Sequence, residues 1–260
     1  MRLISHFETL VEYRDLIMRL AWSDFKLRYK SSVLGFFWSL LEPLLMLLVT
    51  YAIFSYLMKV QVEHYQLFLL LGIILWNFLD RGTTMSISGI IGKPSLVLKV
   101  YFPRDILIIA TCITALMMSL LEFVVFAIFM GIFRVVPDGN ILYLPLIFFF
   151  EFILILGLSL ALSSLVVYFR DVQFIWRLIM QLGFFATPIL YPITIFPDHL
   201  QSLVMLNPMA RIITTLRGCT LYHSPPSAGD LIYVALATLL ILSIGYFIFN
   251  RLEPRFAEEI

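Results

Sequence analysis

Charged residues are scarce in this chain of 260 residues. Asp, Glu, Lys and Arg together make up 13%, whereas hydrophobic residues make up 61% and the mean hydropathy is +0.97. A soluble domain of this length must cover its outside with polar and charged groups, which this composition does not supply. The sequence therefore predicts an integral membrane protein. Its net charge of +1 gives no overall field that would attract nucleic acid.

The sequence also has only two cysteines and lacks the common catalytic motifs. Cys112 and Cys219 are too few for a disulfide framework or a metal site, and we predict that Cys112 is a small apolar side chain within a helix. The sequence has no GxSxG or HExxH motif and no Walker A loop, the nearest fragment being Gly89–Pro94. We expect no enzymatic activity, metal or cofactor in this chain. Its N-terminal segment lacks the compact apolar stretch of a cleavable signal peptide.

Six apolar stretches are long enough to cross a membrane, which takes about 20 helical residues. The predicted fold is a single all-α integral membrane domain over residues 1–260. Thirteen of the 18 Lys and Arg residues fall on the side of the chain termini, so both termini are expected in the cytoplasm. The predicted spans are Phe36–Met58, Leu67–Ile91, Ile106–Phe133, Ile141–Phe169, Val172–Tyr191 and Asp230–Asn250.

An amphipathic segment precedes the first span at residues 5–31. Apolar side chains recur at spacings of three and four from Leu10 to Leu20, with charged residues between them. This pattern favours a helix, or two short ones, lying on the cytoplasmic membrane surface, and an ordinary solvated lead-in is the alternative.

A second segment outside the spans is the cytoplasmic loop 93–105. Pro94 and Pro103 bracket about two helical turns, in which four apolar residues would share one face: Leu96, Val97, Val100 and Tyr101. An apolar face in a cytoplasmic loop is expected to be buried, either against a partner protein or against this chain's own helices.

Two further connections constrain the fold. The tight turn Phe169–Val172 makes its flanking helices antiparallel neighbours. The external stretch 187–227 contains six prolines and the apolar runs Leu200–Leu206 and Ala210–Leu221. These runs are too short to span and too apolar for a free loop, so we predict re-entrant or interfacial half-helices.

Five ionisable residues fall inside the predicted spans: Glu42, Asp80, Arg81, Glu122 and Glu151. Charges in a membrane are costly and usually face a protein interior or a water-filled cavity. For Glu42 and Glu151, a solvated position near the membrane surface is the alternative. Arg81 and Glu122 lie deeper and are predicted to make structural polar contacts or to line a conduit.

Aromatic residues make up 15% of the chain. Packing against lipid and the interfacial aromatic belts accounts for most of them. Some are candidates for lining a path for sugar, because flat rings stack on the apolar faces of pyranoses. The conduit candidates are Tyr51, Phe54, Trp76, Phe185 and Tyr191, together with Arg81 and Glu122.

Several short motifs occur in order along nearly the whole chain. Together they resemble the type-2 ATP-binding cassette (ABC) exporter permeases, in particular the polysaccharide branch. Each motif alone is weakly specific, whereas their combination is specific. The motifs lie at Arg28–Gly35, Gly72–Phe78, Leu98–Asp105, Phe169–Asp171, Thr187–Pro192 and Asn207–Met209 with Arg217.

The resemblance implies a homodimer with a conduit between two six-helix bundles, and two cytoplasmic ATPase subunits that bind ATP and Mg²⁺. Residues 93–104 resemble the coupling helix that contacts the ATPase, residues 5–31 the interface helix, and residues 187–227 the external gate region. The ATPase-coupling residues that it implies are Leu96, Val97, Lys99, Val100, Tyr101, Arg104, Arg170 and Asp171.

The implied substrate is a polyprenyl-pyrophosphate-linked polysaccharide crossing the cell inner membrane, with O-antigen foremost and teichoic acid or capsule as alternatives. Three cations near the inner interface, Lys26, Arg28 and Lys30, are expected to attract its anionic lipid head group. Two other functions stay open. One is a small-lipid or drug exporter with the same fold, and the other is an intramembrane transferase or hydrolase, against which the missing catalytic motifs argue.

Overall fold

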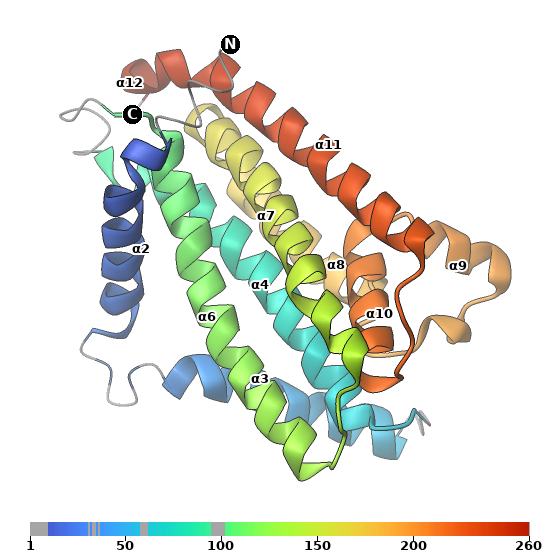
Figure 1. The fold of residues 1–260 in the computed structure, drawn as a ribbon. Coiled ribbons are helices and arrows are strands. Elements are labelled where there is room, and N and C mark those ends of the chain that lie inside the picture. Colours follow the sequence, from blue (N-terminus) through green and yellow to red (C-terminus); the bar gives the residue numbers. More distant parts are fainter. Residues whose placement is uncertain are drawn as a thin grey trace.

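The computed structural model describes residues 10–30, 32, 35, 37–57, 62–94 and 102–259. Within these ranges all regular structure is helical and no strand occurs (Figure 1), which confirms the all-α prediction. A π-helical turn at Ala52–Leu57 continues α3, and the 3₁₀ turn Gly139–Leu142 precedes α7. The helices are α2 (Arg14–Tyr29), α3 (Phe37–Tyr51), α4 (Tyr65–Ile91), α6 (Asp105–Ile132), α7 (Tyr143–Tyr168), α8 (Val172–Ala186), α9 (Asp198–Val204), α10 (Pro208–Leu221), α11 (Ala228–Leu252) and α12 (Phe256–Glu259).

Five helical segments are long and apolar enough to cross a membrane: Phe37–Ser55, Tyr65–Ile91, Asp105–Ile132, Gly139–Tyr168 and Ala228–Arg255. The remaining predicted span, Val172–Tyr191, corresponds to the shorter helix α8, which ends at Ala186 after 15 residues. At about 1.5 Å per residue it reaches roughly 23 Å, less than the roughly 30 Å hydrocarbon core. The helix ends because Pro188 disfavours a helical conformation at Thr187, whose ψ of 142° is extended. A six-span topology stays a prediction.

Helix α4 lies at the centre of the bundle. In its most apolar window 83% of the residues are buried, although the mean hydropathy of 1.3 is the lowest of the five; the window of α11 has a hydropathy of 2.4 and is 17% buried. In water the most hydrophobic helix would be the most buried one. A central helix of low hydropathy among more hydrophobic outer helices is expected when the outer helices face lipid and the central helix faces protein. The burial pattern therefore supports a multi-pass membrane protein.

Helices α7 and α11 pack against each other at a pair of glycines. A Cβ on Gly245 would overlap the carbonyl oxygen of Gly157, and a Cβ on Gly157 would lie 2.6 Å from the Cα of Leu242. Small residues of this kind let membrane helices approach closely. At the end of both helices the Tyr168 hydroxyl donates to the carbonyl oxygen of Leu252 at 2.9 Å. This seam fastens α11, which is otherwise largely exposed, to the bundle.

Helix α2 packs against the first half of α6 (Figure 1). Ile17 and Ala21 are buried against Ile106 and Ala110, and the Thr114 hydroxyl donates to the carbonyl oxygen of Ala21 at 3.1 Å. The helix is therefore part of the fold and not a solvated lead-in. That it lies on the membrane surface stays a prediction, and residues 5–9 and 31 of the predicted segment lie outside the described residues.

The stretch 187–227, predicted to be external, contains two short helices, α9 and α10, in the two predicted apolar runs. Helix α10 begins where the Asn207 side chain accepts a hydrogen bond from the Met209 N–H and Pro208 occupies the first turn. Most of its residues are buried, and it packs against α4, α7 and α11. A re-entrant position in the membrane stays a prediction.

Candidate functional site

Three charged side chains from three helices meet inside the bundle. Arg81 of α4 forms ion pairs with Glu122 of α6 and with Glu42 of α3, the latter at 3.1 Å. Arg81 lies 16 residues after the first residue of α4 and 10 before its last. At about 1.5 Å per residue it is therefore roughly 24 Å and 15 Å from the two ends. The cluster lies well inside the depth of the bundle, away from both ends of α4.

Glu42 differs from its partners because it is exposed. Its side chain is 62% exposed, whereas those of Arg81 and Glu122 are buried. A charged group at this depth is costly in lipid and usually faces a water-filled cavity or another protein surface. Glu42 opens on a groove of about 640 Å³ between α3, α4 and α8, lined by Trp38, Glu42, Leu45, Val49, Asn77 and Phe184.

The other two ionisable residues of the spans behave differently. Asp80 accepts a hydrogen bond from the Thr84 hydroxyl at 3.2 Å. Glu151 is fully buried on α7, and its carboxylate oxygens have no hydrogen-bond partner among the described residues. A solvated position near the membrane surface, one of the two alternatives for Glu151, is therefore wrong.

The predicted conduit aromatics divide into buried and exposed side chains. Trp76 is buried and its ring packs edge-on against that of Phe184. Phe185 is exposed on α8, and its carbonyl oxygen accepts a 2.5 Å hydrogen bond from the Tyr191 hydroxyl. Trp76, like Glu122, thus lies within the packing of this single chain. The remaining candidates, Tyr51, Phe54 and Tyr191, are partly buried.

At the end of the bundle that carries α9 and α10, Arg217 of α10 binds the extended segment that follows α8. Its buried guanidinium donates to the carbonyl oxygens of Phe68 at 2.9 and 3.1 Å, Pro188 at 2.5 Å and Ile189 at 2.8 Å. It also lies 3.3 Å from the centroid of the Phe68 ring. Burial lowers the pKa of Arg217 to about 9, so the group stays charged at neutral pH.

Two residues of α4 complete this connection. The Tyr65 hydroxyl donates to the carbonyl oxygen of Leu190 at 2.6 Å. Gly72 leaves the space that Arg217 occupies, because a Cβ at Gly72 would overlap the guanidinium. Three consecutive carbonyl groups, those of residues 188–190, are thus held by side chains of α4 and α10. The sequence analysis named Arg217 only as part of a motif with Asn207–Met209, since nothing local to it indicates these distant partners.

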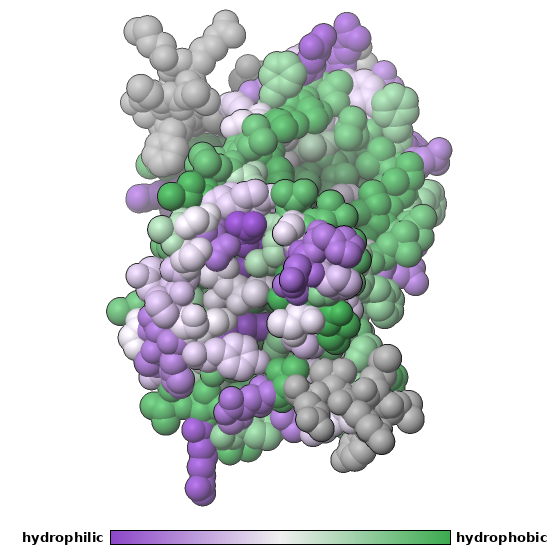
Figure 2. Space-filling view, turned by 90° about the vertical axis from the view of Figure 1, so that its right-hand side faces the viewer, coloured by the Kyte–Doolittle hydropathy of each residue, from purple (hydrophilic) through white to green (hydrophobic). Residues whose placement is uncertain are grey.

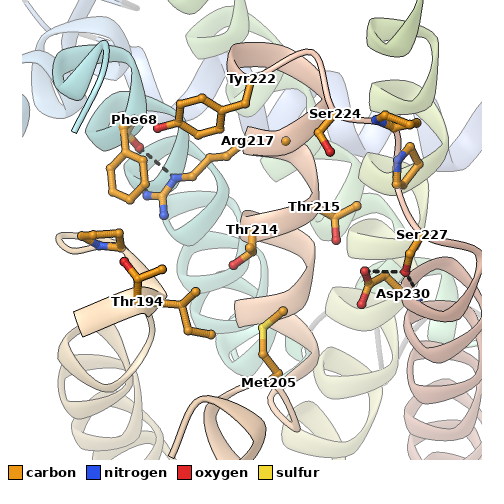
Figure 3. A pocket seen from close by; sticks show the side chains of 15 residues that line it. Phe68, Thr194, Met205, Thr214, Thr215, Arg217, Tyr222, Ser224, Ser227 and Asp230 are labelled. Atoms are coloured by element: carbon orange, nitrogen blue, oxygen red, sulfur yellow. Dashed lines mark hydrogen bonds between the residues drawn. The ribbon is translucent and has the colours of Figure 1, made fainter. Parts of the chain in front are cut away.

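Beside Arg217 lies a pocket of about 430 Å³ (Figure 3). Residues 192–194 form one wall, α10 the back and residues 224–227 the opposite wall, with Met205 below (Figure 3). Seen from the side of α9 and α10, hydrophilic side chains gather between hydrophobic surfaces (Figure 2). The sequence analysis did not identify this pocket, whose walls come from separate segments.

The predicted coupling segment 93–104 is described only at its ends. Leu96, Val97, Lys99, Val100 and Tyr101 lie outside the described residues. At the start, the Lys93 ammonium donates to Asp24 of α2 at 2.6 Å. At the end, the Arg104 guanidinium donates to the carbonyl oxygen of Glu253 at 2.6 Å and lies over the Phe256 ring. The described ends of the segment therefore contact α2 through Lys93 and the end of α11 through Arg104.

The other predicted cytoplasmic residues are exposed. Arg170 and Asp171 lie in the turn between α7 and α8, next to Tyr168, which binds the end of α11. The cations that were predicted to attract a lipid head group are Lys26 and Arg28 of α2 and Lys30, which follows it, and all three are exposed. The Lys26 ammonium lies 5.1 Å from the centroid of the Trp22 ring.

The apolar spans around a buried central helix define a multi-pass membrane protein. The chain belongs to the ABC-2 type transporter family, whose sequence model it matches over residues 15–221. Its relatives include the O-antigen export system permease protein RfbA of Klebsiella pneumoniae, 31% identical over 94% of both chains. The protein of the same name from Myxococcus xanthus is 30% identical over 96% of this chain and 97% of its own. The polysialic acid transport protein KpsM of Escherichia coli is 24% identical over 88% of this chain and 90% of its own.

Proposed function

We propose that this chain is the membrane-spanning subunit of an ATP-driven exporter that moves polyprenyl-pyrophosphate-linked polysaccharide, with O-antigen foremost, across the cell inner membrane. The observation that carries this proposal is its similarity, over nearly the full length, to O-antigen export permeases. Two separate ATPase subunits would bind ATP and Mg²⁺, because this sequence has no Walker A loop. Both termini lie in the cytoplasm in this proposal.

The groove beside Glu42 supports a conduit between two copies of the chain. An exposed carboxylate deep in the bundle disfavours contact with lipid, and the neighbouring helices α3 and α8 expose many large apolar side chains. In a homodimer that pairs these faces, the apolar residues would pack against the second copy. Glu42, Asn77 and Phe185 would then line the path between the copies.

Residues 93–104 are the proposed contact with the ATPase. The tethers at their two ends, Lys93 to Asp24 and Arg104 to Glu253, support this role, because a movement of the segment would pull on α2, α6 and α11 together. The exposed turn Arg170–Asp171 would contact the same partner. The exposed cations of α2 would attract the pyrophosphate of the substrate.

Depletion of the chain in its native cell tests the export function. We expect polyprenyl-pyrophosphate-linked polymer to accumulate inside the cell and to disappear from its surface, as seen by mass spectrometry of extracted lipids. The sugars in that polymer would identify the substrate. Unchanged amounts in both places would contradict polysaccharide export and favour a small-lipid or drug exporter.

Cysteine cross-linking tests the pairing of the copies. The two native cysteines are buried, so they give little background. Val49→Cys places a thiol on α3, where the native side chain is 51% exposed, and Leu236→Cys places one on α11, where it is 64% exposed. In oxidised membranes we expect a disulfide-linked dimer for Val49→Cys and none for Leu236→Cys. The opposite pattern would move the interface to α11.

A further inference from the structure

The pocket beside α10 contains three hydroxyl groups with no hydrogen-bond partner among the described residues. Thr215 contributes one from α10, Thr194 one from the wall that follows α8, and Ser224 one from the opposite wall (Figure 3). Hydroxyl groups both donate and accept hydrogen bonds, so these side chains can bind a ligand that does the same. They come from three segments separated in sequence, and they converge on one volume of about 430 Å³.

The charged groups of the same pocket are already paired. Arg217 makes four hydrogen bonds to backbone carbonyl oxygens from behind the wall. Asp230 accepts from Arg211 at 3.1 Å and from the Ser227 hydroxyl at 2.7 Å. The groups that remain free are therefore neutral hydroxyls, which suit an uncharged polyhydroxylated ligand better than an anion.

Shape and apolar surface point to the same class of ligand. The volume lies in the lower part of the range of about 300–1,000 Å³ that is usual for small-molecule sites, which suits a short piece of a sugar chain. Tyr222, Met205 and Pro225 supply apolar surface next to the hydroxyls. Sites for small polar molecules typically combine such surface with a few polar groups that fix orientation.

We propose that this pocket is a glycan-binding subsite, which takes a neutral sugar unit of the exported polymer on the side of the chain that carries α9 and α10. This inference rests on the proposed export function and adds a place where the sugar chain is held. Helix α10 forms the back of the pocket, and its Arg217 also binds the carbonyl groups of Pro188 and Ile189. A sugar bound in the pocket would therefore contact α10 and the segment after α8, which both belong to the predicted gate region.

Binding to the purified permease in lipid nanodiscs tests the subsite. The probe is the glycan released by mild acid from the lipid-linked polymer that accumulates in depleted cells, and isothermal titration calorimetry measures its affinity. Thr215→Val combined with Ser224→Ala removes two hydroxyls with little change in shape. We expect the affinity to fall about tenfold, since each hydrogen bond contributes modestly. Thr194→Val, on the other wall, is expected to lower it about threefold.

Ser202→Ala on α9 is the matched control, because that hydroxyl is exposed and lies outside the pocket. We expect wild-type affinity for it. If wild-type permease fails to bind the released glycan, or if the pocket variants bind as well as the control, the subsite is wrong while export stands. Loss of glycan binding on addition of phosphatidylglycerol would also overturn it and assign the pocket to an anionic lipid. If no polymer accumulates on depletion, the export function itself fails.

Discussion

Replacement of Arg217 by alanine should destabilise the connection between α4, α10 and residues 188–190. The carbonyl of Phe68 lies within α4, where the helix itself supplies a second donor, so it is not left without a partner. The carbonyl groups of Pro188 and Ile189 lie outside any helix and would lose the only donors observed for them among the described residues. A buried polar group left without its partner costs about 1–3 kcal/mol, so the two together cost about 4 kcal/mol.

Thermal unfolding of the purified permease in detergent measures this loss. For a chain of this size, 1 kcal/mol shifts the melting temperature by about 2–4 °C, so we expect a decrease of about 8–16 °C. Limited proteolysis should also show faster cleavage within residues 187–197. Arg217→Lys keeps the charge but replaces a planar fork with a single ammonium, and we expect about half of the loss.

Tyr65→Phe gives an independent measure of the same connection. It removes only the hydrogen bond to the carbonyl of Leu190, so we expect a loss of about 1–2 kcal/mol. Gly72→Ala should act like Arg217→Ala, because its methyl group would displace the guanidinium. Suppose that Arg217→Ala leaves the melting temperature unchanged while Tyr65→Phe lowers the stability as expected. This result would refute the view that the guanidinium holds residues 188–190.

Three further changes test other parts of the structure. Lys93→Asp should lower export per ATP hydrolysed by the complex, and adding Asp24→Lys should restore it if the ion pair transmits movement. Gly245→Leu should lower the melting temperature by more than 5 °C, since any Cβ there overlaps the α7 backbone, whereas Gly131→Leu, with open space around it, should not. Glu122→Gln, which removes a buried ionic partner, should cost about 3 kcal/mol, measured by thermal unfolding.

Hydropathy and length predicted the membrane class and the positions of five spans, because about 20 apolar residues in a row have few other uses. They could not predict which helix is central. The least hydrophobic span, α4, is the most buried, and this order becomes informative only once helices are seen in contact. Pro188 is a sequence signal for the end of α8 at Ala186. The apolar residues that continue to Tyr191 favoured a longer helix instead.

The candidate site was less accessible to sequence reasoning. Its individual residues could be named, since Arg81 and Glu122 are conspicuous charges in apolar runs. Their pairing, and the addition of Glu42, depends on the approach of three helices that are far apart in the chain. Arg217 posed a harder problem, because its acceptors are backbone carbonyl groups, which every residue possesses and no sequence pattern distinguishes.

The charge cluster also bears on the proposed pairing of two copies. Two carboxylates share one guanidinium, and Glu122 is the one that is buried with it. Glu42 keeps its 3.1 Å ion pair but exposes most of its side chain at the same depth. Lipid would penalise that exposure, whereas water between two copies would stabilise it. The residue that is most costly for an isolated bundle is therefore the one that best fits a path for a hydrated sugar chain.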